Sequence, residues 1–494
     1  MIHALALLAL SGSGALYLIL AWRIHQRSTK LSDQFPLTQR GGQAHVLSAK
    51  EFSAATVSAT ISLATVVLAF ADLAGSMGLW LLWPVITTTA GILVVRSVAP
   101  LILERMSRFG AHRPTLHEFL GAAYQSVALM RTAAACTSLG FLGAFAVELS
   151  VGSRFLANLV PAIPAWIAVI VLAGVGVTYT ALGGFRAVVV TDRIQMWAIW
   201  AAILALGGLI VWQIADAGGW LSFSKQIPSS VYDFSWRPGL GAFLIGIFVI
   251  NVPTFVADMA IWQRIAGSTN QNVAMEGLWS SMLWTAVSWV CLAAIACSLV
   301  ALISTSSNNN LLFEFLVKAG QSQGFGSSVL FLAAVAGLYA ANLSTASTQL
   351  IATAQAVHTD LLRQGHDKET LLHASSELAL SRKILVVAAI VAIVVVEGLT
   401  RAGFSIADLV FAVYGAQLGM VPAVLIALLA DGLTVRRLRR WAPAAVFSGF
   451  VVGWGSAGIG KVIASDDLVF LAPAISLIIS SVIFGIGRIW PSDD

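Results

Sequence analysis

A short polar stretch at residues 341–348 interrupts a long apolar segment that runs from about residue 328 to residue 357. At about 3.6 residues per helical turn, one face of this segment carries one small residue and three hydroxyl groups, from Ala341, Ser344, Thr345 and Thr348. Ser347 lies at the edge of that face. Hydroxyl and carbonyl oxygens can replace the water shell of a small alkali cation, but the same residue types also let membrane helices pack closely. The stretch alone therefore allows both a cation site and a helix contact.

The composition identifies a polytopic membrane protein. The chain has 494 residues, of which 58% are hydrophobic and only 10% charged, and its mean hydropathy is +0.87. The net charge of +5 comes from basic residues that cluster between apolar segments, which argues against nucleic-acid binding. The three cysteines fit no metal or disulfide spacing. No soluble domain is evident, so we expect no enzyme activity and look for function at polar groups within the membrane.

The hydropathy pattern predicts thirteen transmembrane helices. They are expected near residues 2–22, 52–71, 79–98, 131–156, 165–182, 190–214, 240–262, 276–303, 328–357, 384–399, 406–429, 442–463 and 468–489. With the N-terminus outside and the C-terminus in the cytoplasm, six of the 28 Lys and Arg residues lie outside: Arg154, Lys225, Arg237, Lys318, Arg401 and Lys461. This asymmetry favours that orientation in the cell membrane.

The predicted orientation can be tested by cysteine labelling. A cysteine introduced at Ser307 should react with an impermeant reagent added outside sealed cells, whereas one at Gly365 should not, because the basic loops stay in the cytoplasm. Reaction at position 365 in intact cells would contradict the predicted orientation of the helices in the membrane.

A second polar stretch joins two predicted helices at residues 178–195. Gly183 and Gly184 can form a tight turn, and Asp192 is expected about one turn into the following helix. Asp192 has two interpretations. It could be a carboxylate that complements the helix dipole at the start of the helix, or the anionic part of a cation path.

The pattern Tyr-Thr-x-x-Gly-Gly-x-x-Ala-Val-x-x-Thr-Asp-x-x-Gln at residues 179–195 resembles the signature of the sodium/solute symporter family, which includes proline, sugar and sialic-acid transporters. Four further stretches agree with the family in the same order along the chain. They are residues 115–126, Trp262-Gln-Arg264, residues 344–361 and residues 414–419.

This resemblance implies an all-α LeuT-type fold with two inverted five-helix repeats. The implied organisation is an extra N-terminal helix at residues 1–23, a first repeat at 51–214, a second at 240–430, and two C-terminal helices at 441–489. It also implies bound sodium as the coupling ion.

The resemblance further implies particular sodium ligands. For the first site they are the backbone carbonyls of Ala59, Ser62 and Ala341 and the hydroxyls of Ser344 and Thr345. A possible second site, known in some members, corresponds to Asp192, Ser344, Ser347 and Thr348.

The residues expected at the solute site differ from those of the sugar carriers in the family. Residues 63–70 are nearly all apolar and contain no Gly or Pro that would mark an unwound segment. Pro253 does interrupt a later helix, and Asp258 stands where sugar carriers have an amide. We therefore expect a small organic solute such as an amino acid or amine, contacted by Asp258, Val66 and Trp83. Glu148 is expected to form an ion pair with Arg154.

These features predict a sodium-coupled symporter that works by alternating access, with the lipid bilayer and a small organic solute as its partners and no obligate protein partner. Two alternatives remain from the sequence: a membrane sensor built on the same fold without its own signalling domain, and a carrier coupled to protons. A channel is disfavoured because the sparse charge provides no continuous polar path.

Overall fold

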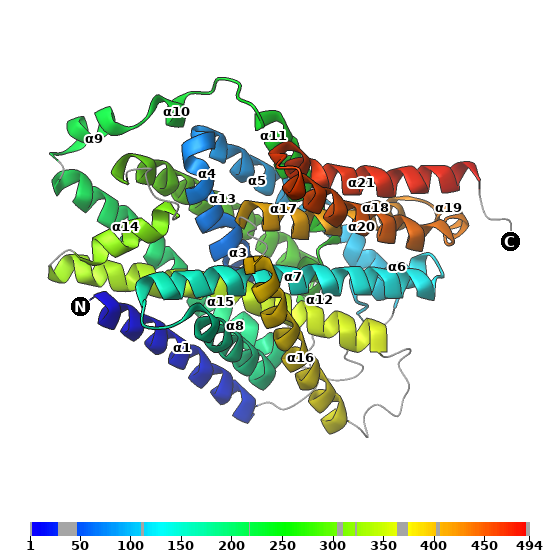
Figure 1. Cartoon of the computed structure of the whole chain (residues 1–494). Coiled ribbons are helices and arrows are strands. Elements are labelled where there is room, and N and C mark those ends of the chain that lie inside the picture. The colour runs from blue at the N-terminus through cyan, green and yellow to red at the C-terminus, as the bar shows by residue number, and fades with distance from the viewer. Residues whose placement is uncertain are drawn as a thin grey trace.

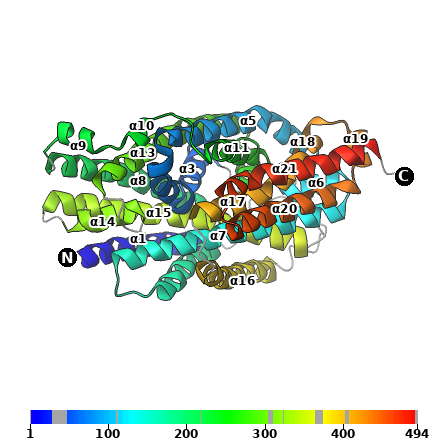
Figure 2. The same cartoon turned by 45° about the horizontal axis from the view of Figure 1, so that its top comes forward.

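The computed structural model describes residues 2–27, 47–109, 113–216, 218–303, 310–321, 324–362, 374–401 and 406–490. Helices dominate this part of the chain, and a single isolated bridge joins Leu47 to Ser268. In both views, α1 and the final pair α20 and α21 lie on opposite sides of the bundle (Figures 1 and 2). Ser307 and Gly365, the positions chosen for labelling, lie outside the described residues.

The helices of the first half are α1 (Ile2–Arg27), α3 (Ala49–Thr60), η1 (Leu63–Leu68), α4 (Ala69–Met77), η2 (Gly78–Leu81), α5 (Leu82–Ser107), α6 (Leu116–Ala123), α7 (Val127–Leu159), α8 (Ala165–Asp216), α9 (Trp220–Gln226) and α10 (Ser229–Tyr232). Those of the second half are α11 (Leu240–Asn251), η3 (Thr254–Ala257), α12 (Met259–Gly267), α13 (Gln271–Leu302), α14 (Leu311–Gly320), α15 (Phe325–Gln355), η4 (Ala356–Leu362), α16 (Ala374–Arg401), α17 (Ile406–Gln417), η6 (Leu418–Met420), α18 (Val421–Leu429), α19 (Gly432–Arg437), α20 (Trp441–Val462) and α21 (Asp466–Ile489).

Eleven apolar helical segments of the described chain are long enough to cross a membrane, and two of them are long enough to cross twice. These two are Leu63–Ser107, with 45 residues, and Ala165–Asp216, with 52. A straight helix of the latter length would span about 78 Å, against a hydrocarbon core of about 30 Å. Each contains a glycine with positive φ, Gly78 at 53° and Gly184 at 58°, where the helix breaks. Thirteen crossings result, as predicted.

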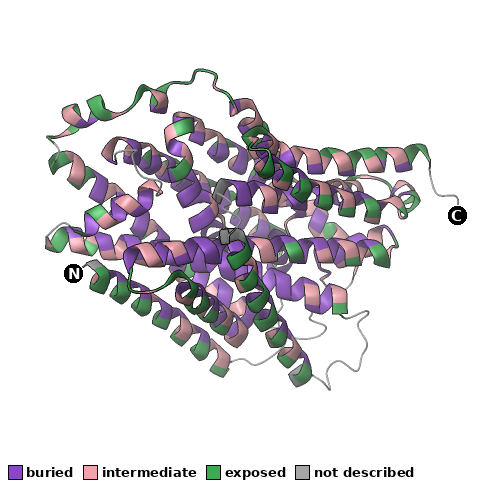
Figure 3. Cartoon of the chain, viewed as in Figure 1, coloured by how far each residue is buried: buried purple, intermediate pink, exposed green. Residues whose placement is uncertain are grey.

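Apolar side chains on the outer faces of the bundle identify the surface that meets lipid. On α8, Trp197, Leu204 and Val211 expose 67%, 72% and 66% of their surface, and their spacing of seven residues places them on one side of the helix. The buried residues gather in the middle of the bundle (Figure 3). The protein is therefore a multi-pass membrane protein whose polar groups face inward.

The membrane helix formed by α3, η1 and α4 is broken between α3 and η1, although it has no Gly or Pro at the break. The α-helix α3 ends at Thr60, Ser62 is extended (φ −71°, ψ 142°), and a π-helix, η1, follows. The Ser62 hydroxyl accepts the backbone N–H of Thr65 at 2.8 Å, so Ser62 caps the second half. The apolar run at 63–70 thus hides a break that the sequence did not indicate.

The second broken helix follows the prediction. The α-helix α11 ends at Asn251, η3 crosses the gap after Pro253, and Asp258 caps α12 by accepting the backbone N–H of Ile261 at 2.8 Å. Pro253 has no backbone N–H, so it cannot continue the pattern of hydrogen bonds along the helix. Two facing helices are therefore interrupted near the middle of the bundle, the arrangement that frees backbone groups for ions and solutes.

Candidate functional site

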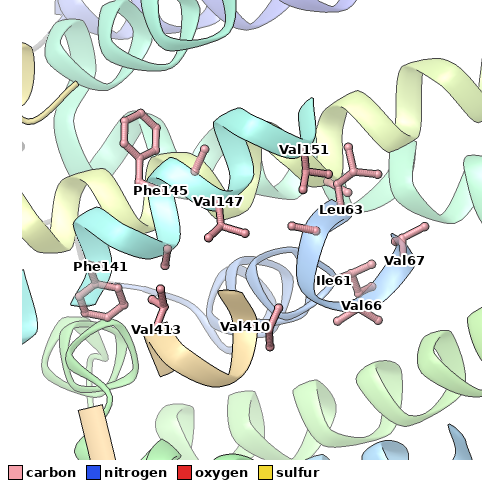
Figure 4. Packing of buried hydrophobic residues seen from close by; sticks show 14 of the residues in the cluster. Ile61, Leu63, Val66, Val67, Phe141, Phe145, Val147, Val151, Val410 and Val413 are labelled. Carbon is pink, nitrogen blue, oxygen red and sulfur yellow. The ribbon is translucent and has the colours of Figure 1, made fainter. Parts of the chain in front are cut away.

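The break between α3 and η1 is held in place by apolar packing against α7 and α17. Figure 4 shows Ile61, Leu63 and Val66 near the break, with Val147 and Val151 of α7 packed beside them. All five are at most 1% exposed. Dense packing of this kind leaves the backbone at the break few alternative positions.

The predicted ligands of the first sodium site come from this break and from the middle of α15. The Thr345 hydroxyl donates to the Ala59 carbonyl at 3.4 Å, so these two predicted ligands are in direct contact. Ser62 follows on the same break, while Ala341 and Ser344 lie on the same buried part of α15 as Thr345. The structure therefore gathers neutral oxygens from two helices that are nearly 300 residues apart in sequence.

Glu148 of α7 links the two elements that carry these ligands. The Ser62 hydroxyl donates to its carboxylate, and the Asn342 amide donates to Glu148 Oε2 at 3.1 Å and to the Glu148 carbonyl at 2.8 Å. Glu148 is fully buried. The predicted ion pair with Arg154 was wrong, because Glu148 faces the helix break, whereas Arg154 interacts electrostatically with Asp72.

Asp192 faces α15 from α8. The Ser344 hydroxyl donates to Asp192 Oδ1 at 2.7 Å. Asp192 Oδ2 has no hydrogen-bond partner within bonding geometry among the described residues, although the Ser58 hydroxyl and the Arg264 guanidinium lie near the carboxylate. Asp192 lies eight residues beyond the kink at Gly184, so it is not in the first turn of a helix. The interpretation as a helix-start carboxylate was therefore wrong.

The other two residues of the predicted second sodium site lie farther along α15. The Ser347 hydroxyl donates to the Ser344 carbonyl at 3.0 Å, and Thr348 Oγ1 accepts from Arg264 at 3.5 Å. All four are buried. An unpartnered carboxylate oxygen beside several hydroxyls is a donor set that suits sodium.

A cavity of about 170 Å³ lies beside the first site. Ala59 and Thr60 line it, so one predicted sodium ligand forms part of its wall. It is smaller than the clefts of about 300–1,000 Å³ that hold drug-sized ligands. Its volume therefore fits a small solute.

The wall of the cavity combines aliphatic side chains with six aromatic and six polar residues. The aromatic residues are Phe70, Phe243, Phe255, Trp289, Phe411 and Tyr414. The polar residues are Thr60, Thr65, Thr88, Asn251, Thr254 and Asp258. None of the residues that line it is Lys, Arg or His.

Of the three residues predicted to contact the solute, only Asp258 lines this cavity. Val66 is buried in the packing of the break. The Trp83 indole donates to the Leu244 carbonyl at 2.9 Å and joins α5 to α11. Sequence reasoning missed the aromatic wall and the role of Glu148. A lone carboxylate inside an apolar segment indicates a functional role. The position of Glu148 in such a segment could therefore have identified it.

Two other motif stretches position α15. The Tyr179 hydroxyl donates to the Leu343 carbonyl at 3.0 Å, directly before Ser344. In η4, which follows α15 directly, Asp360 accepts from the Thr115 hydroxyl at 2.8 Å and lies 2.6 Å from His117 Nδ1. These buried contacts anchor the middle of α15 and the η4 segment that follows it.

Comparison with known proteins shows similarity at the level of structure. No protein-family model matches the sequence, and no curated protein matches it. The structure of a Na⁺-coupled sialic acid symporter in a substrate-bound outward-open state is 17% identical, with a TM-score of 0.74 over 99% of this chain and 98% of that one.

Two more distant structures have the same general architecture. One manganese transporter structure from Eremococcus coleocola is 14% identical, with a TM-score of 0.53 over 93% of this chain and all of that one. Mhp1 in an inward-facing conformation is 12% identical, with a TM-score of 0.53 over 90% of each chain. At these identities the comparisons show the fold, which is LeuT-type.

Proposed function

We propose that this protein is a secondary active transporter that imports a small organic solute together with sodium by alternating access. The observation that carries the proposal is the position of Ala59. Its carbonyl accepts the Thr345 hydroxyl in the predicted first sodium site, and the residue also lines the solute-sized cavity. An ion and a solute that share one wall can each stabilise the geometry that the other needs. The solved structures of similar fold are themselves transporters.

Sodium would act by joining two separate elements. Its proposed ligands are the carbonyls of Ala59, Ser62 and Ala341 and the hydroxyls of Ser344 and Thr345. The first two come from the broken helix and the other three from α15. Bound sodium would therefore hold the break against α15, and the cavity walls that follow the break would be ordered with it. In this way, ion binding favours solute binding.

A second sodium would bind at Asp192, Ser344, Ser347 and Thr348. Ser344 belongs to both proposed sites, and its hydroxyl already contacts Asp192. This sharing supports coupled occupancy, because an ion at either site orients the same hydroxyl.

Sodium is expected to raise the melting temperature of the purified protein, whereas potassium at the same concentration is not. Hydroxyl and carbonyl ligands select by coordination and cavity size, and a cation at 100 times its dissociation constant stabilises by about 2.7 kcal/mol. Ser344→Ala and Thr345→Ala should each weaken the shift, because each removes one ligand. Cys291→Ala on α13, which removes no proposed ligand, should preserve it.

Thermal melts in sodium and potassium chloride at matched ionic strength measure this effect. Equal shifts from both salts would contradict the sodium site. The alternative of a proton-coupled carrier makes a different prediction, since solute uptake into proteoliposomes would then continue without sodium when a proton gradient is imposed.

A further inference from the structure

The N-terminal ends of both half-helices at the breaks are occupied by carboxylates of the protein itself. At η1, Glu148 accepts the hydroxyl of the capping residue Ser62, and the backbone N–H of Ala64 also points at it. At α12, Asp258 Oδ1 accepts the backbone N–H of Ile261. Such helix ends attract anions, and in transporters of this fold they can hold the carboxylate of a substrate. Here neither end is left for a substrate carboxylate.

The cavity between the breaks offers no cationic side chain to an anion. Asp258 is the only acidic side chain that lines it, and no Lys, Arg or His does. The cation that interacts with Asp258 is Arg264, which is 4% exposed, contacts Thr348, and interacts electrostatically with Asp192 as well. This guanidinium is shared between two carboxylates, so it is not the partner of Asp258 alone.

The rest of the wall suits a cation with apolar substituents. Six aromatic residues line the same cavity as Asp258, and among them Phe70 and Trp289 meet edge to face with 5.7 Å between ring centroids. Aromatic faces attract alkylated ammonium groups, and a desolvated contact contributes about 2 kcal/mol or more. The rest of the wall, apart from four threonines and Asn251, is aromatic and aliphatic, which suits the apolar substituents of such a cation.

We propose that the transported solute is a small substituted ammonium cation without a carboxylate, held by Asp258 and the aromatic wall that includes Trp289. This inference rests on the proposed transport function and narrows its substrate class. It favours such a cation over a zwitterionic amino acid, because no Lys, Arg or His lines the cavity to pair with a carboxylate.

Three probes of similar size and shape test the charge requirement. Choline carries a trimethylammonium group and a hydroxyl, 3,3-dimethylbutan-1-ol replaces the charged nitrogen with carbon, and glycine betaine adds a carboxylate. In sodium buffer, choline at saturation should raise the melting temperature of the full chain by at least about 2 °C. The alcohol and betaine at the same concentration should give less than about a fifth of that shift.

Three variants test the roles of Asp258 and Trp289. Asp258→Asn should abolish the choline shift while keeping the sodium shift, because asparagine still caps α12. Trp289→Leu should weaken the choline shift, and Trp289→Phe should restore part of it. The retained sodium shift shows that each variant is folded.

Several results would overturn the proposal. Equal stabilisation by the alcohol or by betaine would remove the charge requirement, and a full choline shift in Asp258→Asn would remove the role of that carboxylate. Tetramethylammonium, dimethylethanolamine and choline could also all leave the melting temperature unchanged while sodium raises it. In that case the substrate class is wrong and the proposed sodium site still stands. Loss of the sodium response in the unaltered protein would instead refute the proposed function.

Discussion

Asp192→Asn is expected to raise the sodium concentration for half-maximal transport by about tenfold or more and to lower the Hill coefficient for sodium toward one. Tenfold corresponds to about 1.4 kcal/mol. The reason is electrostatic. Asp192 is completely buried, and its Oδ2 has no hydrogen-bond partner in bonding geometry within the described chain. The amide of asparagine can keep the contact with Ser344 but cannot offset the cost of dehydrating an ion.

The matched control for this change is Asp258→Asn. Both carboxylates interact with the same guanidinium, Arg264, so each variant removes one carboxylate that interacts with that group. Only Asp192 contacts Ser344, the hydroxyl shared by the two proposed sodium sites. Sodium-dependent uptake, measured with saturating solute for Asp192→Asn, should show the fall in cooperativity. For Asp258→Asn, sodium-dependent melting should keep the unaltered sodium response.

A wild-type Hill coefficient of one, together with an unchanged sodium requirement in Asp192→Asn, would leave only the first site. Asp192 would then serve to position Ser344. A large loss of sodium response in both variants would point to Arg264 and the charge balance around it rather than to a second ion.

The broken helices show where sequence reasoning succeeds and where it stops. Pro253 lacks an N–H, so the break that follows α11 could be predicted from one residue. The break at Ile61 and Ser62 has no such mark. It depends on tertiary partners, since the Ser62 hydroxyl donates to Glu148, 86 residues away, while capping its own helix. Local propensity contains no information about that contact.

The same limit explains the misassigned carboxylates. Arg154 lies six residues from Glu148 and was the obvious partner by sequence distance, but Asn342, 194 residues away, binds it instead. Charge patterning and hydropathy predicted thirteen crossings because a bilayer imposes the same length on every helix. Partner choice inside the bundle follows from packing between distant helices, as it does for Asp192 and Ser344.

The contact between α15 and α8 is the most extensive between any two helices of the described chain, and it depends on Gly337. A Cβ at Gly337 would lie 2.1 Å from the Ala198 carbonyl oxygen and 2.5 Å from Ala202 Cβ. The backbone carbonyl cannot rotate away as a side chain could. Gly337→Ala is therefore expected to destabilise the protein toward the upper end of the about 1–3 kcal/mol typical of overpacking, even though alanine favours a helix more than glycine does.

The matched control is Gly174→Ala, also inside a long helix, where an added Cβ meets nothing within 4 Å. This change should leave the melting temperature unchanged or raise it slightly, because only the helix propensity changes. Gly337→Ala should lower the melting temperature and also reduce the sodium-dependent shift. Displacing α15 from α8 would separate the Ser344 hydroxyl from Asp192 Oδ1, which are 2.7 Å apart in the structure. If Gly337→Ala melts like Gly174→Ala and keeps its full sodium response, the close approach of these helices neither limits stability nor positions the ion ligands.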